Sequence, residues 1–262
     1  MVELLDFTGR TVLVTGASGG LGAGIARVFA EAGATVVLHY RSEPGRAQVV
    51  RSVLPGPGRH VCLQADGADE SSVARCVEET ARIAGEAGIA ALVNNAGIYP
   101  TAPLLDLDLA AWREVVGADL DSTHLFTRAA ARFMRPGSAI VNIASVEGLR
   151  PVRSHAHYSA AKAAVIRYGE AAALELAPLG IRVNTVSPGL VDRPGLAAAW
   201  PSGYQRFIAS APLGRAGAPE EVGRACLFLA SKAASWITGA NLVIDGGASI
   251  VSAQDALGPE LR

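Results

Sequence analysis

The sequence predicts an α/β protein with a doubly wound parallel sheet of about seven strands and helices on both faces. Seven short apolar runs are nearly continuous in Val, Ile and Leu rather than alternating with polar residues. Such runs are typical of parallel strands that are buried on both faces. Alanine-rich segments with a helical pattern separate these runs. Because strands and helices alternate, we expect strand–helix–strand units and hence parallel pairing.

The predicted elements follow one another in a regular order. The strands are expected at residues 11–15, 35–39, 61–64, 91–94, 139–143, 182–186 and 241–245. The helices are expected at residues 21–32, 45–54, 70–84, 112–135, 158–177 and 219–230. No linker, repeat or low-complexity block divides the 262 residues, so we expect one domain over residues 1–247.

Two segments lack a regular pattern. Residues 190–218 are rich in Pro and Gly, and we expect an irregular loop that covers a substrate, because long loops in compact domains often serve as lids. The tail, residues 248–262, is interpreted either as a frayed end or as a subunit contact, and the sequence leaves both open.

Composition excludes several classes of function. The net charge of −1 and the lack of Lys/Arg runs argue against a nucleic-acid partner. The acidic start does not resemble a signal peptide, and no stretch approaches the roughly 18 apolar residues of a membrane span. Three distant cysteines form no C-x-x-C pair, so we expect reduced thiols and a cytoplasmic protein. His155 and His157 lack a third ligand at usable spacing, so no metal is expected.

A glycine-rich turn joins the first strand to the first helix. It reads Thr-Gly-Ala-Ser-Gly-Gly-Leu-Gly over residues 15–22. Gly16, Gly20 and Gly22 permit a tight turn and let the backbone approach a pyrophosphate, which the N–H groups of the helix start then face. The spacing is G-x-x-x-G-x-G rather than the commoner G-x-G-x-x-G. Its position between strand and helix predicts a Rossmann-type dinucleotide site.

The end of the second strand distinguishes between the two nicotinamide cofactors. A site for NAD usually places an acid there, whereas this chain has Tyr40, Arg41 and Ser42, with no carboxylate until Glu43. A guanidinium suits the oxygens of a 2′-phosphate. We therefore expect NADP(H) rather than NAD(H), with Arg41 and Ser42 at the phosphate. The alternative is that Arg41 is a solvated turn residue.

Later strand ends extend the expected pocket, because ligands lie beyond the carboxyl ends of parallel strands. Asp66 follows the third strand and is expected to accept a hydrogen bond from the adenine. Asn94, Ala96 and Gly97 follow the fourth strand, where small residues let the adenosine side lie close. As isolated residues, Asp66 and Asn94 would also serve as simple turn caps.

A tyrosine and a lysine carry the expected chemistry. Tyr158 and Lys162 are four residues apart, which puts the phenol and the ammonium on one face of a helix. A free tyrosine has a pKa near ~10, and a nearby ammonium together with an oxidised nicotinamide lowers it toward working pH. Ser145 ends the fifth strand on the same rim, where its hydroxyl is placed to hold a substrate carbonyl.

These residues, in this order, resemble the short-chain dehydrogenase/reductase family from Thr11 to about Gly247. The matching pieces are the glycine turn, Asn94–Gly97, Ser145, Tyr158-x-x-x-Lys162, Pro188-Gly189 and the closing 237–247 run. The resemblance implies hydride transfer between a nicotinamide and a carbonyl or carbinol carbon. Tyr158 would protonate the oxygen, Ser145 would steady it, and Lys162 would bind the nicotinamide ribose. The resemblance also implies a homotetramer or dimer built on the helices 112–135 and 158–177.

Two positions depart from the family pattern. Asp119 stands where the family usually has an Asn that supports a proton-relay water, and its charge would either strengthen the lysine interaction or disturb the relay. Arg193 stands where relatives often have a Thr that binds the nicotinamide carboxamide, and it is expected to point at substrate or phosphate. Arg150 and Arg153 are interpreted as solvated loop charges or as contacts to an anionic substrate.

The leading hypothesis is an NADPH-dependent reductase of a small-molecule ketone, with 3-oxoacyl or aromatic polyketide ketones as implied substrates. An NADP-dependent alcohol dehydrogenase and a non-catalytic cofactor-binding protein, suggested only by Asp119, stay open as alternatives. The candidate catalytic residues are Ser145, Tyr158, Lys162 and Asp119. The candidate cofactor contacts are Gly16, Ser18, Gly20, Leu21, Gly22, Tyr40, Arg41, Ser42, Asp66, Gly67, Asn94, Ala96, Gly97, Tyr158, Lys162, Pro188, Gly189 and Val191.

Overall fold

The computed structural model describes residues 4–251, and within them one seven-stranded sheet runs through the molecule. The strand order is β3-β2-β1-β4-β5-β6-β7, and every neighbouring pair is parallel. The predicted doubly wound sheet and its seven strands are confirmed. The strands are β1 (Thr11–Val14), β2 (Thr35–Tyr40), β3 (Val61–Gln64), β4 (Ile89–Asn94), β5 (Met134–Ile143), β6 (Arg182–Pro188) and β7 (Asn241–Ile244).

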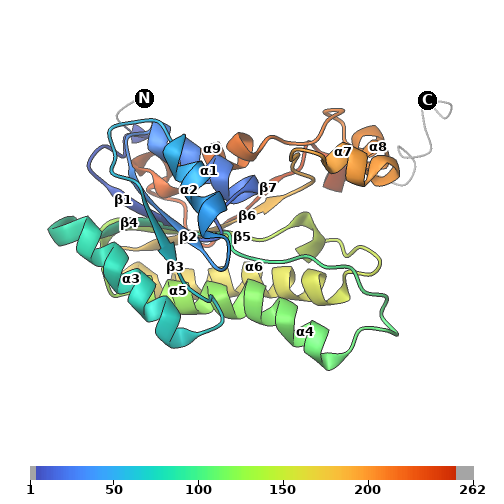
Figure 1. The fold of residues 1–262 in the computed structure, drawn as a ribbon, viewed down its shortest axis with the longest axis horizontal. Helices are drawn as coiled ribbons and strands as arrows, with labels where there is room; N and C mark the ends of the chain where they lie inside the picture. The colour runs from blue at the N-terminus through green and yellow to red at the C-terminus, as the bar shows by residue number, and fades with distance from the viewer. Residues whose placement is uncertain (1–3, 252–262) are drawn as a thin grey trace.

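Helices cover both faces of the sheet (Figure 1). One face carries α1 (Gly20–Glu31), α2 (Pro44–Ser52) and α9 (Pro219–Ala230). The other carries α3 (Glu70–Ala84), α4 (Leu109–Val116), α5 (Ser122–Ala131) and α6 (Ala156–Leu176). The predicted helices at 70–84 and 219–230 have the bounds expected, and those at 21–32, 45–54 and 158–177 exist with ends that differ by one or two residues.

Side chains of the strands alternate between two apolar cores. Val12 and Val14 pack with residues of α1 and α9, whereas Leu13 between them packs with residues of α3 and α5. Each fully buried aliphatic or aromatic side chain stabilises the fold by about 1.5–3 kcal/mol. Phe7 extends the first core, with its ring edge-on to Phe29 at 5.2 Å between centroids.

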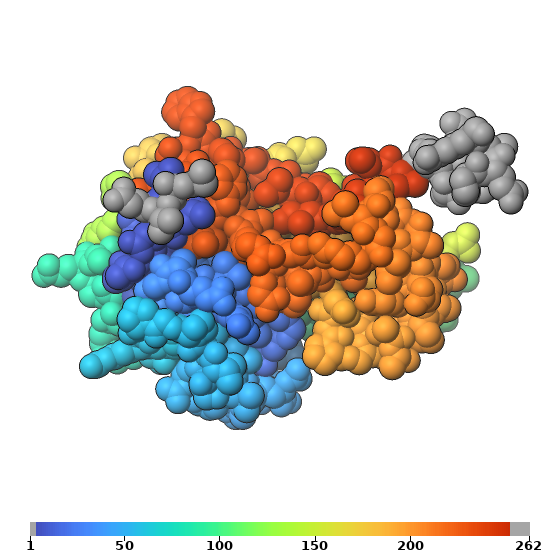
Figure 2. Space-filling view, turned by 90° about the horizontal axis from the view of Figure 1, so that it is seen from above, coloured from blue at the N-terminus to red at the C-terminus, as the bar shows by residue number. Residues whose placement is uncertain are grey.

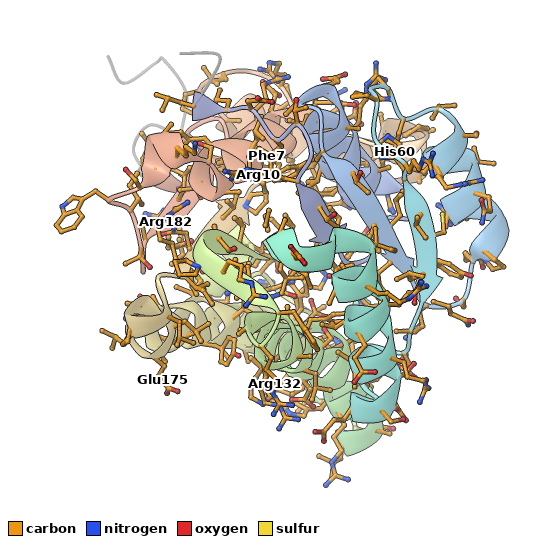
Figure 3. The ribbon with its side chains drawn as sticks, turned by 90° about the vertical axis from the view of Figure 1, so that its left-hand side faces the viewer. Phe7, Arg10, His60, Arg132, Glu175 and Arg182 are labelled. Carbon is orange, nitrogen blue, oxygen red and sulfur yellow. The ribbon has the colours of Figure 1, made fainter. Side chains whose placement is uncertain are left out.

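Two arginines complete the packing on the side of the molecule shown in Figure 3. The Arg10 guanidinium lies 5.6 Å from the centroid of the Phe7 ring. Arg182, at the start of β6, donates hydrogen bonds to four backbone carbonyls, which belong to Leu229, Ala230, Ser231 and Ile237. These bonds satisfy the C-terminal carbonyls of α9, because the last carbonyls of a helix have no partner inside it. The end of α9 is thereby fixed to β6.

The helix predicted over 112–135 is present as one run of helical residues from Leu109 to Ala131, but its bounds differ and a π-helical turn lies inside it. The chain forms α4, then a wide turn of π-helix (Gly117–Asp121), then α5, and β5 already begins at Met134. The side chain of Asp108 caps α4 by accepting from the Ala111 N–H at 2.8 Å. Pro136 disfavours a helical conformation at the residue before it, so α5 ends early and the chain enters the strand.

The segment 190–218 is also more regular than predicted. It contains α7 (Leu196–Ala199) and α8 (Pro201–Ser210), which form a lobe at one end of the molecule (Figures 1 and 2). Pro201 supplies the first turn of α8, a position that needs no N–H donor. The lid role stays a prediction. In the tail, residues 248–250 form a short 3₁₀ turn, and the expectation for 252–262 lies outside the described residues.

Within residues 4–251, no helix combines the length and apolarity that a membrane crossing needs. The same residues hold no group of three or more His, Cys, Asp and Glu side chains placed to bind a metal ion. All three cysteines are free thiols, and burial raises the pKa of Cys76 to about 12.

A buried histidine holds the turn after β1 in place. His39, near the end of β2, is 2% exposed, and its Nδ1 accepts from the Gly16 N–H at 3.2 Å. Because that nitrogen accepts, Nε2 carries the proton and donates to the Ala65 carbonyl at 3.1 Å. Burial lowers the pKa of His39 from 6.5 to about 4, so the ring is neutral at physiological pH.

This histidine makes the fold sensitive to acid. Between pH 6.5 and about 4 the unfolded chain binds a proton that native His39 does not, so the free energy of unfolding falls as pH falls, by roughly 3 kcal/mol over that range. In His39→Asn, stability at pH 7 is expected to drop while this part of the pH dependence disappears. Urea unfolding at pH 7, 6, 5 and 4.5 measures both; parallel curves for the two proteins would contradict the assignment.

Candidate active site

The predicted site residues gather at the edge of the sheet where the parallel strands have their carboxyl ends. The glycine turn follows β1, Arg41 follows β2, Asp66 follows β3, Asn95 follows β4, and Ser145 follows β5. Tyr158 and Lys162 lie in the first two turns of α6, which starts above the same edge. The structure therefore brings together residues from across the whole chain along one line.

The glycine turn is shaped so that side chains do not fit at two of its three predicted glycines. Gly16 has φ +64°, and a Cβ there would lie 2.9 Å from the Cα of Ala96. A Cβ on Gly22 would lie 2.3 Å from the Gly16 carbonyl oxygen. Gly20 has φ +52°, in the left-handed region that favours glycine, although a Cβ there would meet no atom within 4 Å. This backbone cradle, at the positive end of α1, suits the phosphates of a dinucleotide.

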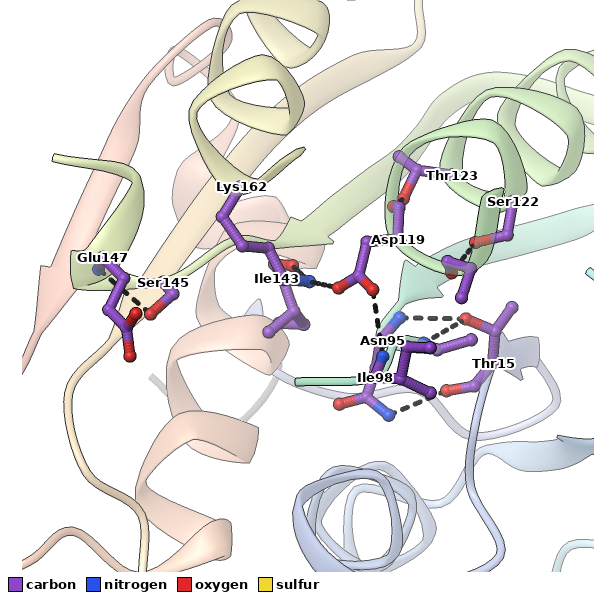
Figure 4. A network of polar contacts seen from close by, with 12 residues as sticks. Thr15, Asn95, Ile98, Asp119, Ser122, Thr123, Ile143, Ser145, Glu147 and Lys162 are labelled. Atoms are coloured by element: carbon purple, nitrogen blue, oxygen red, sulfur yellow. Dashed lines mark hydrogen bonds and ion pairs between the residues drawn. The ribbon is translucent and has the colours of Figure 1, made fainter. Parts of the chain in front are cut away.

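Asn95 and Thr15 fix the turn to β4 (Figure 4). The Asn95 amide donates to the carbonyls of Thr15 and Gly16 at 2.9 and 3.2 Å. The Thr15 hydroxyl oxygen accepts from the backbone N–H groups of Asn95 and Ala96, both at 2.9 Å. The turn is thus held from β2 by His39 and from β4 by Asn95, before any ligand contributes.

Asn94, a candidate cofactor contact, lies in the interior. It is 3% exposed, and its amide donates to Asn142 Oδ1 and Thr127 Oγ1, both at 2.9 Å. Sequence reasoning missed Asn95 as the residue that contacts the glycine turn. The alternation of a strand contained the signal, because adjacent side chains point to opposite faces.

Three basic or hydroxyl side chains surround the end of β2. Arg41 and Ser42 are exposed, directly beyond the last residue of the strand. Arg46, on α2, was not predicted, yet its Nη2 lies 3.0 Å from the position that a Cβ on Gly19 would occupy. Its guanidinium therefore lies beside the glycine turn. Two arginines are therefore present near the end of β2, and one of them, Arg46, lies against the glycine turn.

Asp66 and Gly67 have local structural roles. The Asp66 carboxylate accepts from the Ala68 N–H at 3.0 Å, as in the turn cap considered from the sequence. A Cβ on Gly67 would lie 2.9 Å from the Cβ of Ser122, so glycine is needed for close packing against α5. Ser18, Leu21 and Tyr40 are half-buried beside the turn.

Ser145, Tyr158 and Lys162 come together at the start of α6. Lys162 Nζ lies 5.6 Å from the centroid of the Tyr158 ring. Ser145 Oγ accepts from the Glu147 N–H at 3.1 Å, so its own proton stays available for donation. Gly148 permits the close approach of this loop to α6, because a Cβ there would lie 2.8 Å from the backbone of Lys162 and Ala163.

Asp119 forms a buried ion pair with Lys162 (Figure 4). The carboxylate Oδ1 lies 2.8 Å from Nζ, and the two side chains are 0% and 5% exposed. The ammonium also donates to the Ile143 carbonyl at 3.0 Å, and Asp119 Oδ2 accepts from the Ile98 N–H at 3.0 Å. Gly97 makes room for the carboxylate, since a Cβ there would lie 2.4 Å from Oδ1.

Burial and four neighbouring side chains act on the pKa of the Tyr158 phenol. Burial raises the pKa of the phenol above its ordinary value, and the Asp119 and Glu147 carboxylates raise it further. Lys162 and Ser145 lower it, as predicted for the ammonium, but by less. Among the protein's own groups the effects that raise the pKa prevail, and the lowering expected when an oxidised nicotinamide is also bound stays a prediction. Burial also acts against the Lys162 charge, but Asp119 and Tyr158 outweigh it and raise the pKa of the ammonium.

Aromatic and charged side chains lie beside Tyr158 on its open side. The Tyr99 ring is 6.2 Å from the Tyr158 ring, and the Arg193 guanidinium lies 5.7 Å from the Tyr99 centroid. His155 Nδ1 lies 2.8 Å from Glu147 Oε2, with its ring 6.0 Å from Tyr158. This side therefore offers a polar, partly aromatic surface to a substrate.

The candidate residues after β6 are held against β7. A Cβ on Gly189 would lie 2.8 Å from the Cβ of Asp245, and its N–H donates to the Ile244 carbonyl at 2.9 Å. Val191 forms a parallel bridge with Gly217. Pro188 is the last residue of β6. These residues fix the base from which the segment carrying Arg193 begins.

Chemically, the arrangement provides a cradle for two phosphates, positive charge at the adenosine end, and a phenol beside a serine hydroxyl. A nicotinamide dinucleotide fits this set, because Arg41, the glycine cradle and Lys162 follow one another along the sheet edge, as the adenosine, the phosphates and the nicotinamide do in the cofactor. A substrate held by Ser145 would meet Tyr158 as a proton donor.

Comparisons with known proteins agree with this site. A family model described as enoyl-(acyl carrier protein) reductase matches residues 16–249. The cis-4-hydroxycyclohexanecarboxylate dehydrogenase of Sinomonas cyclohexanicum is 42% identical over 249 residues, which cover 94% of this chain and 98% of the relative. The meso-2,3-butanediol dehydrogenase of Serratia marcescens is 36% identical, covering 95% of this chain and 98% of the relative.

Solved structures share the fold as well. A short-chain dehydrogenase/reductase from Serratia marcescens superimposes with a TM-score of 0.87 at 32% sequence identity. The match covers 93% of this chain and 99% of that one.

Proposed function

Because the chain belongs to the short-chain dehydrogenase/reductase family, whose members are NAD(P)-dependent oxidoreductases, we propose that it reduces a ketone with NADPH and that Tyr158 donates the proton. One observation carries this proposal. A largely buried phenol, held in its protonated form, lies beside a serine hydroxyl and a lysine ammonium at the mouth of a dinucleotide cradle.

In the proposed reaction, the protein's own residues bind the carbonyl oxygen and supply its proton. The bound cofactor supplies the hydride to the carbonyl carbon. The Ser145 hydroxyl, free to donate, hydrogen-bonds to the carbonyl oxygen and polarises it. Tyr158 gives its phenolic proton to that oxygen, which completes the secondary alcohol. The Lys162 ammonium stabilises the phenolate until it regains a proton from water.

Reduction and oxidation require different protonation states of Tyr158. At neutral pH the phenol is protonated, which is the form that a general acid needs. The second candidate function is alcohol oxidation, favoured by the relatives named as dehydrogenases of a hydroxycyclohexanecarboxylate and of a butanediol. That direction requires the phenolate and therefore a higher pH. The aromatic polyketide and 3-oxoacyl substrates stay expectations.

The residues around β2 support NADP(H) as the cofactor. No carboxylate occupies the strand end, and Arg41, Ser42 and Arg46 surround the place where a 2′-phosphate would lie. An acid there would repel the phosphate, whereas guanidinium groups form paired hydrogen bonds to it. We propose that Arg41 makes the main contact and that Arg46 adds to it.

Tyr158→Phe removes the proton donor and preserves the ring. We expect the rate of ketone-dependent NADPH oxidation to fall by about 10²–10⁴-fold, the contribution of a general acid, with little change in NADPH binding. Absorbance of NADPH with a panel of ketones measures the rate. Tyr168→Phe, which removes another phenol on α6, bonded to His124, is the matched control. Equal rates for wild type and Tyr158→Phe would refute the mechanism.

Arg41→Ala tests the cofactor preference. Loss of a charged contact to the 2′-phosphate should raise the Michaelis constant for NADPH by about 10- to 100-fold and leave that for NADH nearly unchanged. Arg46→Ala should show a smaller effect of the same kind. Arg51→Ala, on the last turn of α2, is the control for a general change in charge. A similar increase for both cofactors in Arg41→Ala would rule out the assignment.

Asp119→Asn tests the electrostatic link to Tyr158. The Asp119 carboxylate raises the pKa of the phenol, so its removal should shift the pH midpoint of alcohol oxidation to lower pH, by about one pH unit. The amide keeps an acceptor for the Ile98 N–H. Asp121→Asn makes the same change at an exposed position two residues away. Profiles of kcat against pH compare the three proteins, and an unmoved midpoint in Asp119→Asn would contradict the link.

A further inference from the structure

Arg193 is an arginine that the reaction as described does not use. Its guanidinium lies over the Tyr99 ring at 5.7 Å, and that ring lies 6.2 Å from the ring of Tyr158. Among residues 4–251, no carboxylate forms an ion pair with it. The neighbouring Asp192 carboxylate is engaged elsewhere, by the Arg193 N–H at 2.8 Å and the Tyr204 hydroxyl at 3.4 Å. Within the described part of the chain, this cation therefore has no carboxylate partner, and the Tyr99 ring alone links it to Tyr158.

Both members of the Arg193–Tyr99 pair are attached to fixed parts of the site. Tyr99 follows Ile98, whose N–H is bound by the buried Asp119. Arg193 follows Asp192, whose N–H donates to the Gly217 carbonyl at 2.7 Å. A guanidinium held over an aromatic ring by a cation–π interaction can still donate hydrogen bonds from its N–H groups. Those edges match the two oxygens of a carboxylate.

The loop that precedes α6 is bonded to the segment that follows Tyr99. Ser154, with φ +63°, accepts the Ala102 N–H on its carbonyl at 2.8 Å. A non-glycine residue in the left-handed region carries strain of about 1–3 kcal/mol, and such strain concentrates at ligand sites. The residues 99–102 and 154 therefore form one wall of the substrate opening.

The charges at this opening are predominantly positive. Arg150 and Arg153 are exposed on the loop after β5, and neither forms an ion pair within the described chain. Glu147, the carboxylate that faces Tyr158 from this loop, is bound by His155 Nδ1 at 2.8 Å. An anionic ligand would therefore meet attraction here and a cationic one repulsion.

We propose that Arg193, stacked on Tyr99, binds a carboxylate on the substrate, so that the enzyme acts on ketones or alcohols that carry a carboxylate away from the reacting carbon. This inference rests on the proposed function, because it places the reacting carbonyl at Tyr158 and Ser145. The phosphates of the cofactor are served elsewhere, by the glycine cradle after β1 and by Arg41 after β2. Arg193 follows β6 and lies on the Tyr99 side of the phenol.

The test compares two ketones that differ in one charge: a cyclohexanone with a ring carboxylate and its methyl ester. Wild type should prefer the acid, and Arg193→Gln should lower kcat/KM for the acid by about 10- to 100-fold while leaving the ester and the Michaelis constant for NADPH unchanged. Arg193→Lys should recover part of the loss, since it restores the charge without the planar fork. Arg206→Gln, an exposed arginine on α8, should change neither substrate.

A binding measurement separates this inference from the proposed reaction. Calorimetry with cyclohexanecarboxylate, which has no ketone, should show binding to the NADPH-loaded wild type and a matching loss in Arg193→Gln. If neither ketone reacts but this binding depends on Arg193, the proposed function fails and the carboxylate site stands. An equal loss for acid and ester, a rise in the Michaelis constant for NADPH, or binding unaffected by the substitution would overturn the carboxylate site. Thermal unfolding of each variant confirms that it is folded.

Discussion

The ion pair between Lys162 and Asp119 is the interaction on which the geometry of the site depends. Both side chains are buried, and a buried charge without its partner typically destabilises a protein by about 3–5 kcal/mol. Lys162 also donates to the Ile143 carbonyl, and Asp119 also accepts from the Ile98 N–H. The pair therefore joins the ends of β5 and β4 to α6 and to the wide turn before α5. Gly97 is glycine because the carboxylate occupies the space of its side chain.

The same ion pair determines the charge around the Tyr158 phenol. A lysine neutralised by a carboxylate attracts a phenolate less than a lone lysine does, and burial disfavours the phenolate further. The inner part of the site therefore keeps Tyr158 as an acid. The outer part has the opposite balance, with Arg193 unpaired at the opening. In the proposed reaction, proton transfer in the neutral interior and attraction of the substrate at the positive opening therefore fall to different residues.

Much of the fold and of the site was predictable because it depends on local sequence. Runs of β-branched residues fix the strands. Gly22 is required by contact with the Gly16 carbonyl six residues before it, and the positive φ of Gly16 favours glycine there. The four-residue spacing of Tyr158 and Lys162 places both on one face of α6 in any helix. The π-helical turn at Gly117–Asp121 inside a predicted helix and the short helices of the segment 190–218 have no such periodic pattern, and they were not predicted.

The sequence alone determined which chemical groups stand at the strand ends and that a helix carries the phenol and the amine together. Only the tertiary structure decided which of these groups meet. It placed Asn95 rather than Asn94 against the glycine turn, brought Arg46 to Gly19, and joined Arg193 to Tyr99 from segments almost a hundred residues apart. The reason is physical: contacts between distant segments follow from how crossover helices pack on the sheet, and no local periodicity encodes that packing.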